Sequence, residues 1–194
     1  MKSFNHLWEV ATSEETIKKS VHKVILSRKK LHRIKKYLDE DYTASLVPYW
    51  IEHYQNDYHT PRTIYDGISR KKRTIIVPTF KELVVQHCVV EALMPVFKQG
   101  MYEHSYASIP GRGAHKGKKV IEKWIRNDSK NCKYVLKMDI KHFFDSVPHD
   151  ILKERIGKYI HDERMVNLCN KIIDVSNVGL PLGFIPRNGS LIGI

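Results

Sequence analysis

The sequence has no long apolar run and no paired cysteines. A membrane-spanning helix needs about 20 consecutive apolar residues, and no stretch of this chain approaches that length. The first residues, MKSFNHLWEVATSEET, also lack the apolar core of a signal peptide. Cys88, Cys132 and Cys169 are far apart and form no Cys-x-x-Cys pair, which argues against a disulfide framework or a zinc cluster. We therefore expect a cytoplasmic protein that does not associate with a membrane.

Acidic residues are scarce relative to basic ones. The chain has 33 Lys and Arg against 21 Asp and Glu, a formal net charge of +12, and its 42% apolar residues argue against disorder. Each Lys or Arg placed on a phosphate releases counterions and adds sequence-independent affinity. The surplus therefore favours nucleic acid as the partner over a merely basic, soluble surface. An anionic membrane is a weaker candidate.

Residues 12–40 are predicted to form one or two helices with a basic face. Thr12 or Ser13 can cap the first helix, and acidic residues lie in its first turn. The basic face is either a solvated surface or a contact for phosphates, and both interpretations remain open. The apolar residues at helical spacing on the opposite face are Val21, Val24, Ile25, Leu31, Ile34 and Leu38.

Residues 70–97, RKKRTIIVPTFKELVVQHCVVEALMPVF, begin with a basic cluster and a β-branched run. The run at 74–77 predicts a strand that ends at the following proline, so the basic cluster would lie on a hairpin arm. Thr79 and Glu82 have the spacing of a capping box, and apolar residues then follow at helical intervals. A basic arm is therefore predicted to lead into a buried helix. That helix should end or kink near Pro95.

A glycine-rich loop precedes the next predicted helix, within SYASIPGRGAHKGKKVIEKWI (residues 105–125). Glycines let the backbone approach a ligand closely, and the positive charge around them fits a phosphate or template contact better than a simple turn. The basic residues around the loop are Arg112, His115, Lys116, Lys118 and Lys119. The inner face of the helix is predicted to consist of Val120, Ile121, Trp124 and Ile125.

In the segment KYVLKMDIKHFFDSVPHDIL, residues 133–152, an apolar strand pattern ends on an acidic residue. Tyr134 to Met138 predict a largely buried strand, and Asp139 follows directly. Helices are then expected at 148–159 and 162–173. The order strand, helix, helix predicts an α/β layer and not an all-helical bundle.

The carboxylate of Asp139 needs a cation if its strand is buried, because an isolated ionised group is costly there. It could cap a turn or pair with Lys137 or Lys141, or it could bind a metal. Nucleotidyl transfer by two Mg²⁺ ions requires oxygen ligands. It also requires a flat apolar wall against the incoming sugar, for which Phe144 is placed, whereas Phe143 is predicted to belong to the core.

Four blocks in series resemble the fingers and first palm segment of a bacterial retroelement reverse transcriptase, over about residues 50–184. They are KRTIIVPTFKELVVQHCVVEALMPVF, YEHSYASIPGRGAHKG, YVLKMDIKHFFDSVPHDIL and GLPLG. One such block is weak, but four in the right order are specific. If the codons after Phe184 are read in a shifted frame, the fourth block reads Leu-Gly, three residues and Ser-Gln, and this pattern with SYASIPGRGAH most resembles the enzymes of diversity-generating retroelements, followed by group II intron and retron enzymes. The resemblance implies an α/β fold of fingers and partial palm, with helices packed on an incomplete sheet. Its implied division is a basic helical region at 1–49, fingers at 50–132 and the first part of the palm at 133–184.

The resemblance implies an RNA-directed DNA polymerase that extends a DNA primer on an RNA template, using deoxynucleoside triphosphates and Mg²⁺. Asp139 resembles the first catalytic aspartate, which binds metal, and the carbonyl of Ile140 resembles a further metal ligand. Phe144 resembles the steric gate that rejects a ribose 2′-hydroxyl. Asp145 is interpreted as a turn or capping residue and not as a second metal ligand.

Basic and turn residues carry the other roles that the resemblance implies. Arg73, and less directly Lys72, resemble the residues that bind the triphosphate. The residues that resemble the family's turn around the template–nucleotide pair are Gly179, Pro181 and Gly183. Further contacts to nucleic acid are expected from Arg70, Lys71, Arg112, His115 and Lys116. Whether an accessory protein takes part stays open.

The chain also departs from the family. Leu182 stands where many relatives have glutamine, and no Tyr-x-Asp-Asp occurs, so the second pair of metal carboxylates is missing. Residues 185–194, IPRNGSLIGI, do not match the family either. Codons for this segment, read one base earlier, permit Tyr-Thr-Ser-Gln-Trp-Phe-Ala-Asn-Trp-Tyr, which is typical of reverse transcriptases. We therefore interpret 185–194 as an out-of-frame tail on a truncated chain that is inactive alone.

Two other functions are compatible with the sequence. The first is a basic RNA-binding module that uses the N-terminal helices and the hairpin arm without chemistry. The second is a degenerate remnant whose apolar edge is exposed where the rest of a palm should pack.

Overall fold

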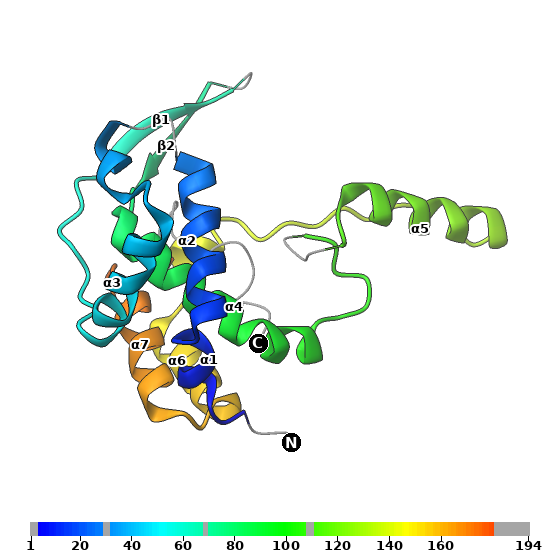
Figure 1. Ribbon diagram of the computed structural model, residues 1–194. Helices are drawn as coiled ribbons and strands as arrows, with labels where there is room; N and C mark the ends of the chain where they lie inside the picture. The colour runs from blue at the N-terminus through cyan, green and yellow to red at the C-terminus, as the bar shows by residue number, and fades with distance from the viewer. Residues whose placement is uncertain (1–3, 29–31, 68–69, 108–110, 181–194) are drawn as a thin grey trace.

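The computed structural model describes residues 4–28, 32–67, 70–107 and 111–180 (Figure 1). Most elements are helices gathered in one block, from which a hairpin and a single helix project (Figure 1). A mixed helical structure with a small two-stranded sheet agrees with the predicted α/β class. The elements are α1 (Leu7–Ala11), α2 (Glu14–Arg28), η1 (His32–Tyr37), α3 (Glu40–Glu52), β1 (Arg62–Asp66), β2 (Lys71–Ile75), α4 (Phe80–Gly100), α5 (Ala114–Asn127), η2 (Phe144–Ser146), α6 (His149–Tyr159) and α7 (Glu163–Ile173).

Helix α4 is the centre of the block and packs against α1, α2, α3 and α7. The predicted capping box is confirmed: the Thr79 hydroxyl accepts from the backbone N–H of Glu82, and the Glu82 carboxylate accepts from that of Thr79. Of the predicted end or kink near Pro95, the end is not seen, because α4 continues to Gly100 with Pro95 inside it; a kink stays a prediction. Burial explains the continuation, since Phe97 beyond the proline is 0% exposed and packs into the core.

The predicted N-terminal helices are confirmed as α2 and the short η1. Ser13 caps α2, since its Oγ accepts a hydrogen bond from the backbone N–H of Thr16 at 3.3 Å. Most of the predicted apolar stripe is buried, but Leu38 is 45% exposed and Leu31 lies outside the described residues. The stripe fails at Leu38 because the chain turns there between η1 and α3, so helical spacing no longer sets which side faces the core.

Several lysines on the basic face of α2 are already paired. Lys19 Nζ lies 2.6 Å from the carboxylate of Glu91 on α4, and Lys23 contacts the same carboxylate. Lys18 lies 2.8 Å from Glu14, one turn earlier on α2. For these three lysines the structure favours a helix-to-helix and surface role over phosphate contact.

Strands β1 and β2 form the predicted hairpin arm. They pair in antiparallel register, with Ile64 opposite Arg73. The second strand covers 71–75 and not 74–77, so the basic cluster itself joins the ladder. Arg70, at the turn, has φ +46°.

The predicted buried strand at 134–138 is wrong. This segment is extended, yet Tyr134 is 94% exposed, Leu136 79% and Met138 80%. No strand among the described residues pairs with it, since β1 and β2 form the sheet found there. The predicted packing of helices on an incomplete sheet is likewise not seen among the described residues, where the helices pack mainly on one another.

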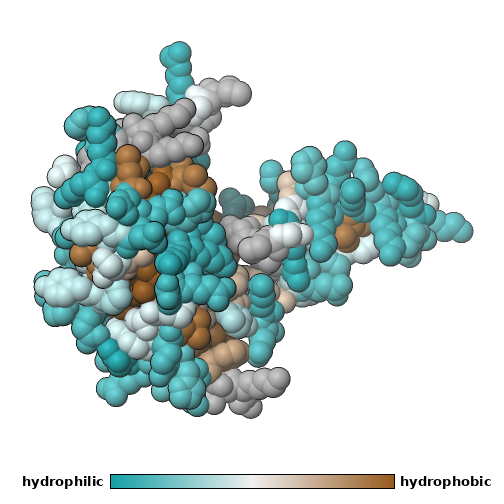
Figure 2. Space-filling view, in the orientation of Figure 1, coloured by the Kyte–Doolittle hydropathy of each residue, from teal (hydrophilic) through white to brown (hydrophobic). Residues whose placement is uncertain are grey.

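Helix α5 forms as predicted, but its apolar face is not an inner face. Ile121 is 52% exposed, Trp124 45% and Ile125 47%. The helix projects from the block (Figure 1), and an apolar patch shows among the polar side chains of this projection (Figure 2). Its amphipathic pattern is therefore real, and the loop before it covers the apolar side only in part, since the His104 ring packs edge-to-face on Trp124 with ring centroids 4.8 Å apart.

Helices α6 and α7 close the block at the other end of the chain. Pro148 is the N-cap of α6; Leu152 and Ile156 are buried, and Ile151 is 50% exposed. The predicted order of these helices after the extended segment is confirmed.

The N-cap of α7 also ties the start of the chain to this end. One oxygen of Asp162 accepts from the backbone N–H of Met165 at 3.1 Å, and the other accepts from that of Trp8 at 2.7 Å. Beside it, Phe4 and Ile160 form a parallel bridge. The first described residues are thus held against α6 and α7.

Candidate functional site

A groove of about 1170 Å³ lies between the hairpin arm and residues 138–145. Residues far apart in the sequence line it: strand β2 contributes Lys72, Arg73 and Thr74, and the later segment contributes Met138, Asp139, Ile140, His142, Phe143, Phe144 and Asp145. The structure therefore brings the predicted triphosphate-binding residues to the same groove as the predicted metal-binding residues.

Asp139 lies at this groove with its side chain exposed. Among the described residues its carboxylate makes no ion pair, so the alternative of a structural pair with Lys137 or Lys141 is not seen. An exposed carboxylate that faces a groove and has no internal cation is available to an external one. Asp139 therefore lies where it could bind a metal ion, and this role stays a prediction.

The two phenylalanines after Asp139 both line the groove. Their ring centroids are 5.4 Å apart at an interplanar angle of 69°, an edge-to-face arrangement. Phe143 is only partly buried and does not belong to the core cluster, so its predicted core role is wrong. The segment turns sharply at His142 (φ +54°), which directs both rings to the groove.

Gly179 holds the turn that carries Phe144. Its φ is +72°, and a Cβ built there would lie 2.6 Å from the Phe144 oxygen and from the Asp145 carbonyl. The backbone N–H of Leu180 donates to the Phe144 oxygen at 2.7 Å, and that of Gly179 donates to the Val147 oxygen at 3.2 Å. A glycine is needed here because two backbones approach closely. Pro181, Leu182 and Gly183 lie outside the described residues.

Arg112 makes structural contacts. Its guanidinium donates to the backbone oxygens of Tyr102 (3.2 Å), Glu103 (2.9 Å) and Ser105 (3.2 Å). It thereby holds the loop before α5, where Gly111 has φ +75°. A contact of Arg112 with nucleic acid stays a prediction.

The other predicted nucleic-acid contacts are not gathered at the groove. His115 and Lys116 are exposed on the first turn of α5. Arg70 is exposed at the tip of the hairpin, while the side chain of Lys71 lies outside the described part of the structure. Their roles stay predictions.

The donors at the groove fit a hard cation only in part. The Asp139 carboxylate and the Ile140 carbonyl are the oxygen ligands that Mg²⁺ prefers, and Mg²⁺ keeps several waters and substrate phosphates as its other ligands. Across the described ranges, no group of three or more His, Cys, Asp or Glu side chains could hold a metal. The described residues therefore supply only part of the ligands that a metal site needs.

Sequence reasoning did not single out three residues of the groove: Thr74, Met138 and His142. His142 Nδ1 lies 3.3 Å from the Asp145 carboxylate, inside the turn. Asp145 is a turn residue, as predicted, since it lies within η2. The left-handed backbone of His142 could not be predicted from the sequence, because histidine adopts that conformation only in a small minority of cases, although more often than most other residues.

Comparison with known proteins identifies the family. The family described as reverse transcriptase (RNA-dependent DNA polymerase) matches residues 61–187, well over half of the chain. The chain belongs to the reverse transcriptase family. The match covers the hairpin, α4, α5 and the whole groove.

Two curated proteins are similar to this member of the family. Protein YkfC of Escherichia coli (strain K12) is 23% identical over 113 residues, 58% of this chain and 30% of that protein. An uncharacterized 91 kDa protein in cob intron of Schizosaccharomyces pombe is 27% identical over 113 residues, 58% of this chain and 14% of that protein. The matched part thus spans less than a third of either relative.

The family brings general expectations about cofactors and substrates. Reverse transcriptases generally act on a template and primer with deoxynucleoside triphosphates and use divalent metal ions. As for membranes, no helix of the described residues has both the length and the apolar character needed to cross one.

Proposed function

We propose that this chain forms the fingers and the first part of the palm of an RNA-directed DNA polymerase. The proposed division is fingers at 50–132 and palm at 133–184, after a basic helical region at 1–49. The enzyme extends a DNA primer on an RNA template by two-metal nucleotidyl transfer with Mg²⁺. The observation that supports this most is the groove that Lys72, Arg73, Asp139 and Phe144 line together.

The proposed roles follow from the chemistry of these side chains. Arg73 and Lys72 offset the charge of the triphosphate, and a guanidinium can bind two phosphate oxygens at once. The Asp139 carboxylate and the Ile140 carbonyl would hold Mg²⁺, which supplies charge stabilisation at the reacting oxygens when bound. Phe144 would pack against the sugar of the incoming nucleotide. Gly179 keeps that ring in place by permitting the close backbone turn.

One carboxylate does not complete a two-metal site, so we propose that the 194-residue chain alone does not synthesise DNA. No Tyr-x-Asp-Asp occurs in its sequence. The proposed location is the cytoplasm.

Nucleotide binding tests the groove without requiring synthesis. In the 194-residue chain, Asp139→Asn should weaken Mg²⁺-dependent binding of a deoxynucleoside triphosphate at least about tenfold, since it removes the charged ligand. Titration followed by isothermal calorimetry measures this. Asp150→Asn, an exposed carboxylate outside the groove, is the matched control and should leave binding unchanged. Equal affinities in both variants would refute the assignment of Asp139.

The RNA-binding module without catalysis is the second candidate, and the net charge of +12 favours it. If it is correct, RNA binding should persist in Asp139→Asn, with no Mg²⁺-dependent nucleotide binding in the parent chain. Nucleotide binding that depends on both Mg²⁺ and Asp139 would decide against it.

A further inference from the structure

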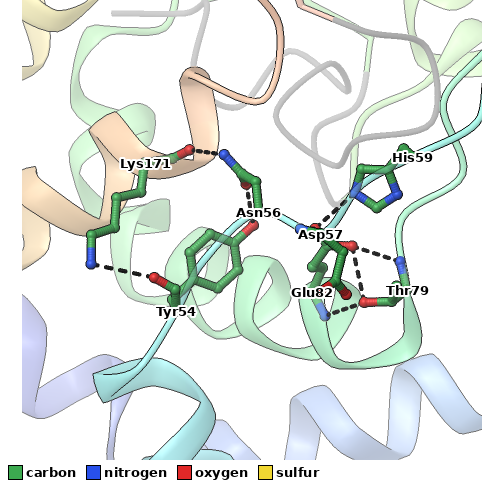
Figure 3. A network of polar contacts seen from close by, with 7 residues as sticks. All are labelled: Tyr54, Asn56, Asp57, His59, Thr79, Glu82 and Lys171. Carbon is green, nitrogen blue, oxygen red and sulfur yellow. Dashed lines mark hydrogen bonds and ion pairs between the residues drawn. The ribbon is translucent and has the colours of Figure 1, made fainter.

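The two segments that connect the β1–β2 hairpin to the block, just before β1 and just after β2, both form hydrogen bonds to one buried carboxylate. These two segments are called the feet of the hairpin. Glu82, on the first turn of α4, is 2% exposed. Its Oε1 accepts hydrogen bonds from the backbone N–H of Asp57 (3.1 Å) and from Nε2 of His59 (2.8 Å), both upstream of β1. Its Oε2 accepts from the backbone N–H (2.7 Å) and the hydroxyl (2.9 Å) of Thr79, downstream of β2. Figure 3 shows these donors converging on Glu82 from both sides. Each carboxylate oxygen therefore serves one foot.

The capping box explains only half of this arrangement. That motif pairs Thr79 with Glu82 and needs one carboxylate oxygen. The bonds to Asp57 and His59 lie outside it and hold a connector, residues 54–61, that belongs to no helix or strand. The His59 and Glu82 side chains are 7% and 3% exposed, so solvent and salt screen their contact weakly.

The start of the same connector is bound to α7. The Tyr54 hydroxyl donates to Asn56 Oδ1 at 3.1 Å, and Asn56 Nδ2 donates to the backbone oxygen of Lys171 at 2.6 Å. In addition, Lys171 Nζ donates a hydrogen bond to the Tyr54 backbone oxygen at 3.3 Å. The network in Figure 3 thus joins α7, the connector and the start of α4.

Two apolar side chains of β1 are largely in solvent. Ile64 is 43% exposed and Tyr65 is 69% exposed, and an isolated two-stranded hairpin is at best marginally stable. Its attachment to the block through Glu82 should therefore contribute to its direction. That direction decides whether Lys72 and Arg73 face Asp139 across the groove.

We propose that Glu82, together with His59, is a positioning residue for this hairpin: one buried carboxylate fixes both feet and thereby the place of Lys72 and Arg73. The importance of the position of Lys72 and Arg73 for nucleotide binding rests on the proposed function. The positioning of the hairpin by Glu82 does not, so it can be tested without a substrate.

Hydrogen exchange on the 194-residue chain provides the first test. His59→Leu has no donor, so it removes one upstream bond and leaves the capping box intact; the backbone amides of 57–66 should then exchange about tenfold faster, while those of α4 change less than about twofold. His22→Leu is the matched control, because the His22 ring meets Glu40 at 3.1 Å on the exposed surface. Equal exchange at 57–66 in the two variants, or acceleration spread over α4, would overturn the proposal.

Distance measurement provides the second test, on a readout that a loss of helix stability alone would not move. Glu82→Gln offers one acceptor oxygen in place of two, so it must release one foot. Spin labels at Tyr65→Cys and Ser45→Cys, in a Cys132→Ser background, should give a distance distribution that is broader in Glu82→Gln than in the parent. An unchanged distribution in a folded Glu82→Gln chain contradicts the proposal. If the parent chain shows no nucleotide binding that depends on Asp139 while its hairpin is fixed, the proposed function fails and the positioning role of Glu82 stands.

Discussion

The helical block differs from a second projection, α5 with residues 128–140, which is called the arm below and is distinct from the β1–β2 hairpin. Both regions have apolar residues at regular spacing, but these residues are buried in the block and exposed in the arm. Leu93 and Phe97 of α4 are 0% exposed, whereas Trp124 of α5 is 45% exposed and Leu136 of the extended segment is 79% exposed. In both regions the pattern fixes the local conformation, a helix or an extended chain. Burial requires a second surface as well. The block supplies such surfaces within the described residues, whereas α5 and residues 128–140 have little beyond the contact of His104 with Trp124 there.

The largest expected effect comes from making the same substitution in both regions. Leu93→Ala should lower the free energy of unfolding by about 2–5 kcal/mol, because it leaves a cavity in a packed core. Leu136→Ala should change it by less than about 0.5 kcal/mol, since the side chain is already in water. Urea denaturation followed by circular dichroism measures both. A large loss in Leu136→Ala would show that the arm is covered in solution.

Two glycines give the next largest contrast. Gly179→Ala should destabilise the protein by about 1–3 kcal/mol, because φ is +72° and the added Cβ would lie 2.6 Å from backbone atoms. Gly157, within α6, has nothing within 4 Å of such a Cβ. Gly157→Ala should stabilise the protein by about 0.5–1 kcal/mol. Thermal unfolding of both variants checks the prediction, and a neutral Gly179→Ala would contradict the close turn beneath Phe144.

The smallest effect concerns the three thiols, which are divided between the two regions. Burial raises the pKa of Cys88 to about 11 and that of Cys169 to about 12, and Cys132 is exposed on the arm. Because only the thiolate attacks, iodoacetamide at about pH 8 should modify Cys132 at least about a hundredfold faster than the other two. Mass spectrometry of the time course measures this.

The same burial gives a pH dependence of definite sign. The ordinary pKa of the thiol is 9.0, and folding raises it at Cys88 and Cys169. Above pH 9 the unfolded chain loses these protons while the folded chain keeps them, so this contribution lowers the free energy of unfolding from about pH 9 to pH 11. Below pH 9 it is constant. A Cys88→Ala variant should show a shallower decline, and an equal slope would contradict the assignment.

Local features were predictable from the sequence because their causes are local. The Thr79–Glu82 capping box, the Ser13 cap and the helix after Asp162 depend on residues three or four positions apart. The hairpin was predicted as an arm, although its strand begins at Lys71 and not at Thr74. The position of Asp139 at a groove with Arg73 was also expected, through resemblance and not through spacing.

The misses on burial share one cause, which is that burial depends on a partner. Tyr134 to Met138 have the composition of a central strand, yet no described strand pairs with them, and Trp124 has the spacing of an inner face, yet it is 45% exposed with only the His104 ring packed on it among the described rings. Phe143 was assigned to the core because the turn at His142, with φ +54°, could not be foreseen. The double use of Glu82 was missed because the sequence shows its capping box but not the connector that folds back onto it.

The bond from Trp8 to Asp162 spans 154 positions of the chain. At synthesis rates of about 5–20 residues per second, roughly eight to thirty seconds separate the appearance of these two residues at the ribosome. The hydrogen bond from α1 to Asp162 can therefore form only after α6 has been synthesised. A contact near the start of the block thus depends on a segment made much later.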